Sequence, residues 1–546
     1  MPDPEVNRPW GGRIPVVVLV ATLAFGALGS VWSVMAPLGE APDEPAHLAL
    51  VLHLADGHPY PDYDGLYNQV AIVRLCKTYA SSTRACPNKG EKVTQTSMRR
   101  HPAADAPDKA TRPAWDDDGG AANKGAINQM PQHPPLYYQA MATVLRAERW
   151  VGGGPWSTDR ELALLRLVNV LLITPLPLLA WWAARRFGLD ERLAVTASLA
   201  VFGVPMLTHL GSTVNNDNLL TLLCAVVVAL LAGVVRGDRS TRTGVLVGVA
   251  TGLALLTKAF AVVLPPLVLI AYLIGALSRR DAATSAGTAL KRMVRPLLVA
   301  GGVTAVLSAW WYVGVRARTG RFAPTTESTS LSSALRPPGF QADRLEFTGT
   351  FLRNLDNRFW GAFGWYSIRF STPVATVCFA VVAVTVGVAL WPREGAAGST
   401  RIQRAFLLLP MAALGAFVVL RAWSLYVETS KFQFIQGRYL FGGITAITVL
   451  VAIGAHRLAG RWATVVVAGA ALVLQAEALR RCLQGWWGGP GLGPRGQVKA
   501  MVAWSAWPGE LVAVMAVLAV ATGLWLAWAL WRWMAAGPSA AGTATP

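Results

Sequence analysis

Residues Ile14–Val34 read IPVVVLVATLAFGALGSVWSV, and the chain soon continues to the run PDEPAH at Pro42–His47. The first run is apolar over the ~20 residues that a helix needs to cross ~30 Å of hydrocarbon. It is longer than the apolar part of a secretory signal and lacks a small-x-small cleavage site, so it predicts an uncleaved anchor. The second run places Asp43, Glu44 and His47 where the chain leaves the bilayer. Ionisable groups there indicate a functional site, and an acidic helix N-cap is the alternative.

The composition indicates a multi-pass membrane protein. Hydrophobic residues make up 53% of the 546 residues and charged residues only 14%, whereas a soluble domain carries about 25% charge. The mean hydropathy is +0.40. The sequence predicts an all-α bundle of about twelve transmembrane helices. The predicted spans are Ile14–Val34, Leu162–Trp182, Leu193–Leu210, Leu219–Val235, Val245–Leu256, Val262–Leu277, Pro296–Trp311, Pro373–Leu390, Ala405–Leu420, Phe441–Ile453, Ala463–Leu474 and Leu511–Trp531.

The positive charges concentrate in short turns between these spans. With Arg8 and Arg13 inside, every cluster falls on the cytoplasmic side, as the positive-inside bias demands. This distribution explains the net charge of +19 without nucleic acid. It also requires Pro134–Leu145 to be an interfacial or re-entrant helix, because another crossing there would place all the later Arg clusters on the outer side of the membrane. The clusters are Arg185, Arg186 and Arg192; Arg236, Arg239 and Arg242; Arg279, Arg280, Lys291, Arg292 and Arg295; Arg401 and Arg404; and Arg457 and Arg461.

The predicted topology divides the chain into six parts. Within the first outer loop, the run Asp116-Asp117-Asp118 lies in a low-complexity stretch and indicates a solvated loop rather than a cation site. The parts are 1–37 (tail and first span), 38–160 (extracytoplasmic loop with the catalytic motif and juxtamembrane helices), 161–315 (spans two to seven), 316–371 (second outer loop), 372–476 (spans eight to eleven) and 477–546 (outer loop, last span and cytoplasmic tail).

Polar and aromatic residues gather at the predicted outer ends of the spans. A carboxylate pair beside Arg and Lys at a bilayer boundary suits a lipid-phosphate substrate with a hydroxyl acceptor. Each element also has a simpler explanation, since Arg side chains can snorkel, a Lys can mark a turn and Trp residues can form an aromatic belt. The set comprises Asp43, Glu44, His47, Gln132–Tyr138 (QHPPLYY), Arg166, Asn215–Asp217 (NND), Lys258, Phe359–Trp365 (FWGAFGW) and Gln436–Tyr439 (QGRY).

Four of these motifs resemble those of the GT-C glycosyltransferases, in a bacterial and actinobacterial branch often described only as predicted membrane proteins. They are PDEPAH at Pro42–His47, HPPLYY at His133–Tyr138, FWGAFGW at Phe359–Trp365 and QGRYL at Gln436–Leu440. The likeness to protein O-mannosyltransferases and to the lipid A aminoarabinose transferase is more distant. The chain lacks the luminal domain of the mannosyltransferases, and we identify no second catalytic carboxylate in its first loop.

The resemblance implies transfer of a sugar from a polyprenyl-phosphate carrier to an extracytoplasmic acceptor, either a cell-envelope glycan or a glycoprotein. It implies that Asp43 acts as the base or positions the acceptor, with Glu44 as its companion. The positive-inside pattern predicts a cytoplasmic N-terminus, and the high Arg, Ala and Gly usage fits a high-GC bacterium. We therefore expect a bacterial plasma membrane protein with an outward-facing active site. The candidate substrate-binding residues are His47, His133, Tyr137, Tyr138, Lys258, Trp365, Gln436, Arg438 and Tyr439.

The chemistry of glycosyl transfer fits these residue types. The acceptor hydroxyl loses a proton as it attacks the anomeric carbon, and a positioned carboxylate such as Asp43 can take it. The leaving phosphate needs positive charge, which Arg438 and Lys258 can supply. A divalent metal ion bound by Asp43 or Glu44 is the alternative source of that charge.

Two other classes of protein fit a polytopic chain. A transporter or lipid flippase for envelope precursors would place charge near the membrane midplane and show internal repeats, whereas here the charge lies at span ends and no repeat is evident. Lys258 and Pro265-Pro266 keep this alternative open. A non-catalytic scaffold would not need a carboxylate pair at the exit of the first span.

Cys76 and Cys86 have loop-like spacing in the predicted outer loop, where disulfides persist. We expect them to be bridged and to stabilise the loop by up to about 3 kcal/mol in the chain-entropy model. Intact-mass analysis after non-reducing alkylation measures this directly. Two alkylated thiols at these positions would contradict the prediction.

Overall fold

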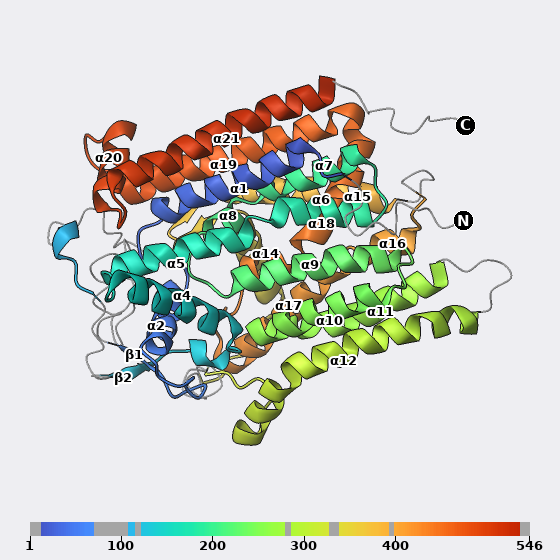
Figure 1. Ribbon diagram of the computed structural model, residues 1–546, viewed down its shortest axis with the longest axis horizontal. Helices are drawn as coiled ribbons and strands as arrows, with labels where there is room; N and C mark the ends of the chain where they lie inside the picture. Colours follow the sequence, from blue (N-terminus) through green and yellow to red (C-terminus); the bar gives the residue numbers. More distant parts are fainter. Residues whose placement is uncertain are drawn as a thin grey trace.

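The computed structural model describes residues 13–69, 108–114, 122–278, 286–326, 338–391 and 398–535. These residues form a bundle of long helices, with shorter elements gathered at one end (Figure 1). The long or apolar helices are α1 (Val16–Met35), α5 (Thr158–Ile173), α6 (Leu176–Arg186), α9 (Asp217–Val235), α10 (Thr241–Thr257), α11 (Leu264–Ser278), α12 (Ala286–Thr319), α15 (Thr372–Leu390), α17 (Leu409–Thr429), α18 (Ile444–Ala459), α19 (Ala463–Trp487) and α21 (Gly509–Ala535).

The all-α polytopic class predicted from the sequence is confirmed, and the count of spans depends on how three regions are treated. The described residues contain 9 stretches long and apolar enough to cross a membrane, or 10 if one bent pair counts as a span. One of them, Gly437–Trp487, contains both α18 and α19, and α10 is a shorter apolar helix. If the bent pair is one span and α18, α19 and α10 each cross once, the total equals the twelve predicted spans.

The predicted span Leu193–Leu210 is not one continuous helix. It consists of α7 (Glu191–Ala200), a 3-10 turn η3 (Val201–Gly203) and α8 (Pro205–Gly211), with a bend of 70°. Val204 lies at the break with φ −119° and ψ 89°. A residue before proline is sterically excluded from the helical region, so the break follows from Pro205.

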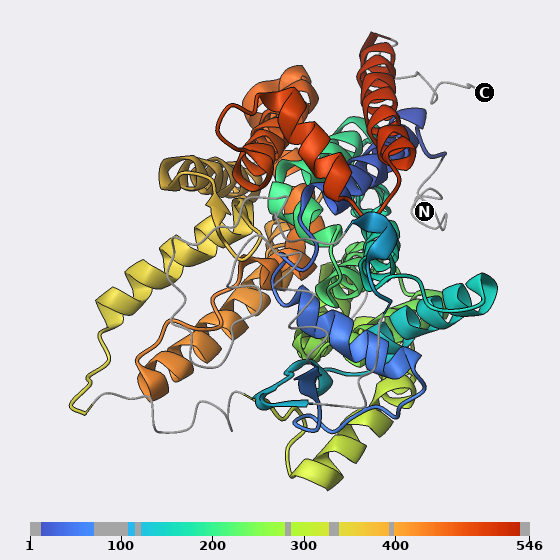
Figure 2. The same ribbon diagram turned by 90° about the vertical axis from the view of Figure 1, so that its left-hand side faces the viewer.

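Short helices and strands cover one end of the bundle. Figure 1 places α2, α4, α20 and the β1–β2 ribbon there, and Figure 2 looks onto this end, with α2 lying across it. As predicted, the helix after Pro134 is not among the candidate spans. The elements with their bounds are α2 (Glu44–Ala55), α4 (Leu136–Gly152), α14 (Arg344–Trp360), α20 (Pro494–Trp504), β1 (Tyr67–Gln69), β2 (Ala122–Ile127), β3 (Ala362–Phe363), β4 (Ile368–Arg369), η1 (Lys109–Thr111), η2 (Met130–Gln132), η4 (Ala259–Val263) and η5 (Gly437–Gly443).

The two small sheets are antiparallel two-stranded ribbons. In the first, Tyr67 pairs with Ile127 and Gln69 with Ala122, with an irregular register between them. In the second, Ala362 pairs with Arg369, which makes the FWGAFGW motif the end of α14 followed by a tight ribbon.

The opposite end holds the start of α1, the end of α21 and the connections from α6 to α7 and from α9 to α10 (Figure 1). It also holds α16 (Arg401–Phe406), while η6 (Gly460–Trp462) joins α18 to α19. The Arg-rich turns after α6 and α9 therefore share the end where the chain enters and leaves the bundle. This arrangement agrees with the charge pattern from which we predict that this end faces the cytoplasm.

Cysteine labelling can test the predicted orientation. His58 lies just after α2 and Arg461 lies between α18 and α19, and both are exposed. In intact cells, a membrane-impermeant maleimide should label His58→Cys and leave Arg461→Cys unmodified until the membrane is opened. The wild-type chain, with its native cysteines, supplies the background signal. Labelling of Arg461→Cys alone in intact cells would reverse the orientation.

Candidate functional site

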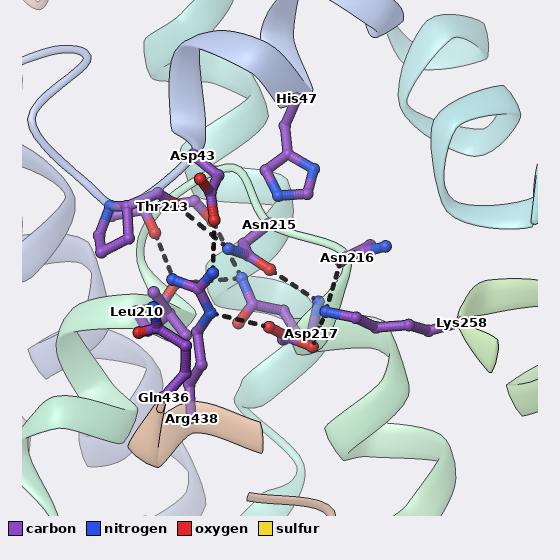
Figure 3. A network of polar contacts seen from close by, with 12 residues as sticks. Asp43, His47, Leu210, Thr213, Asn215, Asn216, Asp217, Lys258, Gln436 and Arg438 are labelled. Carbon is purple, nitrogen blue, oxygen red and sulfur yellow. Dashed lines mark hydrogen bonds and ion pairs between the residues drawn. The ribbon is translucent and has the colours of Figure 1, made fainter. Parts of the chain in front are cut away.

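The side chain of Asp43 does not cap its own helix. Asp43 occupies the N-cap position of α2 with φ 63°, and its carboxylate makes no capping hydrogen bond. Oδ2 instead accepts a hydrogen bond from Arg438 Nη2, and Gln129 Nε2 lies 3.3 Å from Oδ1. Left-handed backbone is more accessible to Asp than to most residues. The carboxylate is thereby turned away from α2 towards the loop ends drawn in Figure 3.

Glu44 points the other way and is fully enclosed. Arg166 donates to both of its oxygens, from Nε at 2.8 Å and from Nη2 at 2.6 Å. The backbone N–H groups of Gly39 and Val214 also donate to it, at 3.0 and 3.1 Å. Neither Glu44 nor Arg166 has any exposed side-chain surface. With its lone pairs occupied by four donors, Glu44 anchors the start of α2 and has little capacity left for a substrate.

Arg166 ties α5 to the segment that follows α1. Besides Glu44, its guanidinium donates to the carbonyl oxygens of Ser33, Ala36 and Pro37 at 2.6 to 2.9 Å. These bonds satisfy carbonyls at the end of α1, where intrahelical donors run out. Arg166 is therefore a structural residue of the site rather than a snorkelling side chain.

Asp217 is the second carboxylate of the site, and it comes from α9 rather than from the first outer loop. Lys258 Nζ lies 2.6 Å from its Oδ1, and Arg438 Nε lies 3.2 Å from its Oδ2. Asp217 is the first residue of α9, where the helix dipole favours a negative charge. The sequence analysis noted the polar run but left Asp217 out of the candidate site residues.

The resulting cluster joins two carboxylates with two cations. Arg438 bridges Asp43 and Asp217, and Lys258 extends the chain to Asn216 Oδ1 at 3.4 Å (Figure 3). The Arg438, Asp217 and Lys258 side chains are 4% exposed and Asp43 is 19% exposed. Asp43 is thus the member of the cluster that remains most accessible.

Several buried donors in this cluster lack a hydrogen-bond partner among the described residues. They are Arg438 Nη1, Arg438 Nε and Asn216 Nδ2. Arg438 Nε is close enough to Asp217 for an ion pair but is not aligned for a hydrogen bond. Buried polar groups are nearly always satisfied, so orphaned donors need an explanation. A ligand with anionic oxygens would supply one.

His47 and Tyr138 flank the cluster as a buried pair. His47 Nδ1 lies 2.9 Å from Tyr138 Oη, and the two rings stack with centroids 5.8 Å apart. Burial lowers the pKa of His47 well below its usual range, and the charges of His133, Lys258 and Arg438 lower it further. His47 is therefore neutral at pH 7. Burial likewise raises the pKa of the Tyr138 phenol.

The remaining candidates make contacts of their own around the cluster. Tyr439 packs on Phe260, and Lys258 Nζ lies 4.9 Å from the Tyr439 ring centroid. Gln436 Oε1 accepts a hydrogen bond from Tyr366, the residue after Trp365. The buried Tyr137 donates to Asn169 Oδ1 at 3.0 Å.

His133 is tied in through its main chain, since its carbonyl accepts from Tyr60 Oη at 2.7 Å. Burial lowers the pKa of its imidazole, and the charges of Lys258 and Arg438 act in the same direction. The structure thus links Asp43, Arg438 and Lys258 through Asp217, since Arg438 contacts both carboxylates and Lys258 contacts Asp217. Cys76, Cys86 and the run Asp116-Asp117-Asp118 lie outside the described residues.

The carboxylates do not form a metal-ligand set as they are placed. Among the described residues there is no group of three or more His, Cys, Asp or Glu side chains suited to holding a metal ion. Asp43 and Asp217 both face cationic side chains, and Glu44 is occupied by four donors. We therefore derive no chemical step through a metal.

Comparison with known families finds one match that covers most of the chain. A family model described as "Predicted membrane protein (DUF2142)" matches residues 25–483. Among curated proteins, no significant relative is found.

Three solved structures illustrate what the chain resembles. ArnT from Cupriavidus metallidurans bound to undecaprenyl phosphate shares 17% identity over 72% of this chain and 67% of that chain, with a TM-score of 0.37. The apo oligosaccharyltransferase of Archaeoglobus fulgidus shares 12% identity over 90% and 56% of the two chains, with a TM-score of 0.40. AglB from the same organism, in complex with an inhibitory peptide and a dolichol-phosphate, shares 13% identity over 73% and 48%, with a TM-score of 0.27.

The family match agrees with the branch of predicted membrane proteins that the motifs resemble. The identities and TM-scores are too low to carry an argument about substrate or mechanism. That argument rests on the side chains described above.

The Glu44–Arg166 pair predicts a large loss of stability on mutation. Glu44→Gln removes one charge of a fully buried pair and should lower the free energy of unfolding by about 3–5 kcal/mol. Glu477→Gln is the matched control, because Glu477 pairs with Arg480 and Arg481 at an exposed site, where ion pairs contribute about 0–1 kcal/mol. Thermal unfolding in lipid nanodiscs measures both. Equal melting temperatures for the two variants would contradict the structural role of Glu44.

Proposed function

The chain belongs to the DUF2142 family of predicted membrane proteins, and from that premise we propose that it is an integral membrane glycosyltransferase. In this proposal it moves a sugar from a polyprenyl-phosphate donor to an extracytoplasmic acceptor, a cell-envelope glycan or glycoprotein, in a bacterial plasma membrane. The observation that carries the proposal is the buried charged cluster with unsatisfied donors at one end of the bundle.

The binding of the phosphate of the sugar substrate is assigned to the N–H groups that lack hydrogen-bond partners. Arg438 Nη1 and Asn216 Nδ2 lack partners within the described residues, and the Lys258 ammonium is adjacent. Charge-assisted hydrogen bonds from such groups to phosphate oxygens are strong, particularly where water is excluded. The same groups stabilise the extra negative charge that the phosphate acquires when its bond to the sugar breaks.

Asp43 is assigned as the base that takes the proton of the acceptor hydroxyl. In a single displacement, the acceptor oxygen forms a bond to the anomeric carbon while the bond from that carbon to the phosphate oxygen breaks. The acceptor proton passes to an Asp43 carboxylate oxygen, and polyprenyl phosphate leaves. One positioned carboxylate suffices because the phosphate needs no protonation to depart. In this assignment Glu44 positions the helix that carries Asp43 and takes no part in the proton transfer.

The position of the cluster suits a substrate held in the bilayer. The cluster is built from the start of α9, the junction between α10 and η4, and η5 just before α18. These are ends of apolar helices, so a prenyl chain lying between helices would present its phosphate at this level. The aromatic rings of Phe260, Phe434 and Tyr439 pack together beside Lys258 and supply an apolar wall there.

Two substitutions should separate proton transfer from phosphate binding. Asp43→Asn keeps the size of the side chain but removes the base, so turnover should fall by ~10² to 10⁴ while donor binding survives. Arg438→Ala should weaken donor binding and turnover together, because the phosphate is charged before and during the reaction. The assay is transfer in lipid nanodiscs from undecaprenyl-phosphate-linked mannose, arabinofuranose or galactose.

Asp56→Asn is the control for the first substitution. It removes the same charge from the other end of α2, where Asp56 pairs with Arg149, whose side chain is 16% exposed, and should leave turnover unchanged. Wild-type turnover by Asp43→Asn would refute the role of Asp43 and favour a transporter for lipid-linked precursors.

A further inference from the structure

The second oxygen of the Asp43 carboxylate is held by a side chain from another part of the chain. Gln129 Nε2 donates a hydrogen bond to Asp43 Oδ1 at 3.3 Å, while Arg438 donates to Oδ2. Gln129 lies between β2 and η2, in the segment that leads to α4. Two donors from separate segments therefore fix the orientation of the carboxylate that we assign as the base.

The segment that carries Gln129 is anchored by its neighbour. Asn128 Nδ2 donates to the carbonyl oxygen of Ala46 in α2 at 2.9 Å, and Asn128 Oδ1 accepts from Met130 N at 2.9 Å. The backbone N–H of Asn128 also donates to the Leu66 carbonyl at 2.8 Å. Asn128 and Met130 are buried, whereas Gln129 is half-buried. The bond from Gln129 to the carboxylate is therefore not what fixes this loop.

An amide is well suited to this position. An ionised carboxylate can only accept hydrogen bonds, so the NH₂ group of Gln129 faces Asp43. The amide adds no charge to a cluster in which two carboxylates and two cations are already in contact. Each carboxylate oxygen has two lone pairs, so Oδ1 can accept from Gln129 and still take a proton.

The geometry of the proposed reaction puts the acceptor near Oδ1. In a single displacement, the attacking oxygen and the leaving phosphate oxygen lie on opposite sides of the anomeric carbon. Arg438 contacts Oδ2 and reaches from there to Asp217, which also contacts Lys258 (Figure 3). The cations that we assign to the phosphate are thus linked to Oδ2. The acceptor hydroxyl therefore approaches Oδ1, the oxygen that Gln129 holds.

We propose that Gln129 is a positioning residue for the acceptor side of the reaction. The inference rests on the proposed function and deepens it, because it assigns the acceptor proton to Oδ1 of Asp43 and names the side chain that orients this oxygen. The acceptor oxygen bonds to the anomeric carbon, its proton passes to Oδ1, and polyprenyl phosphate leaves. Gln129 acts through Asp43 and takes no part in binding the phosphate.

Gln129→Met tests this role, because it keeps the length of the side chain and removes the N–H group that Asp43 accepts. The assay is transfer in lipid nanodiscs from undecaprenyl-phosphate-linked mannose, arabinofuranose or galactose. The acceptor probes are the methyl glycosides of these sugars and a threonine-containing peptide. The kcat/KM for the acceptor should fall ~10- to 100-fold, because the base is no longer held at the attacking hydroxyl. The Kd for undecaprenyl phosphate and the melting temperature should stay at their wild-type values.

A double-mutant cycle separates positioning from a merely structural role. Because Gln129 acts through Asp43, Gln129→Met should cause no further loss of turnover in the Asp43→Asn background. Gln497→Met is the matched control, since Gln497 is also half-buried and its Nε2 donates to the Leu492 carbonyl at 3.1 Å. The Gln497→Met variant should transfer the sugar at the wild-type rate.

Three results would each overturn the inference. They are a wild-type kcat/KM for the acceptor in Gln129→Met, a loss of undecaprenyl phosphate binding or of thermal stability in that variant, and additive effects in the double mutant. A wild-type protein that transfers no sugar to any probe contradicts the proposed function, and this inference falls with it. Normal transfer by both the wild-type protein and Gln129→Met contradicts only the role of Gln129.

Discussion

The site depends on one guanidinium shared by two carboxylates from distant parts of the chain. Arg438 contacts Asp43, which precedes α2, and Asp217, which begins α9. A buried charge left without its partner is strongly unfavourable, so the three segments are held together by electrostatics as well as by packing. Glu44 and Arg166 stabilise the same region, because their hydrogen bonds fix the turn that positions Asp43. The position of the proposed base is thus determined from both sides.

The charges of the cluster suit a reaction that moves one proton. The two negative charges of Asp43 and Asp217 are balanced by the two positive charges of Lys258 and Arg438. A bound phosphodiester donor therefore gives the site one net negative charge. In the proposed reaction, the phosphate gains a second negative charge when its bond to the sugar breaks, while the acceptor proton neutralises Asp43. The total charge of the site stays the same through the step. Arg438 can therefore shift its hydrogen bonding from Asp43 to the phosphate as the reaction proceeds, which stabilises the developing charge without reorganising the protein.

Sequence patterns predicted the membrane class. They also predicted that Asp43, Lys258 and Arg438 lie in one region, because charged residues at the ends of membrane spans indicate a functional site. They did not separate the roles of Asp43 and Glu44. The two adjacent side chains have different partners, Arg438 for Asp43 and Arg166 for Glu44, and only the fold shows this. Asp217 was left out because its significance lies in tertiary pairing with Lys258 and Arg438. The break before Pro205 was detectable from the residue type alone, but the apolar run around it masked the signal.

Backbone strain at the site also favours a functional role for the cluster over a purely structural one. Among the described residues, Asp43, Tyr366, Ser430 and Phe434 are the non-glycine residues with positive φ. Three of these four contact the site, through Arg438, Gln436 and Tyr439 respectively. Each such conformation costs about 1–2 kcal/mol, and strain of this kind persists only where the surrounding structure enforces it. A scaffold that needed only stability would not combine strained backbone, buried charges and unsatisfied donors at one place. Their coincidence around Gln436–Tyr439 supports the proposed binding and catalytic role of this site.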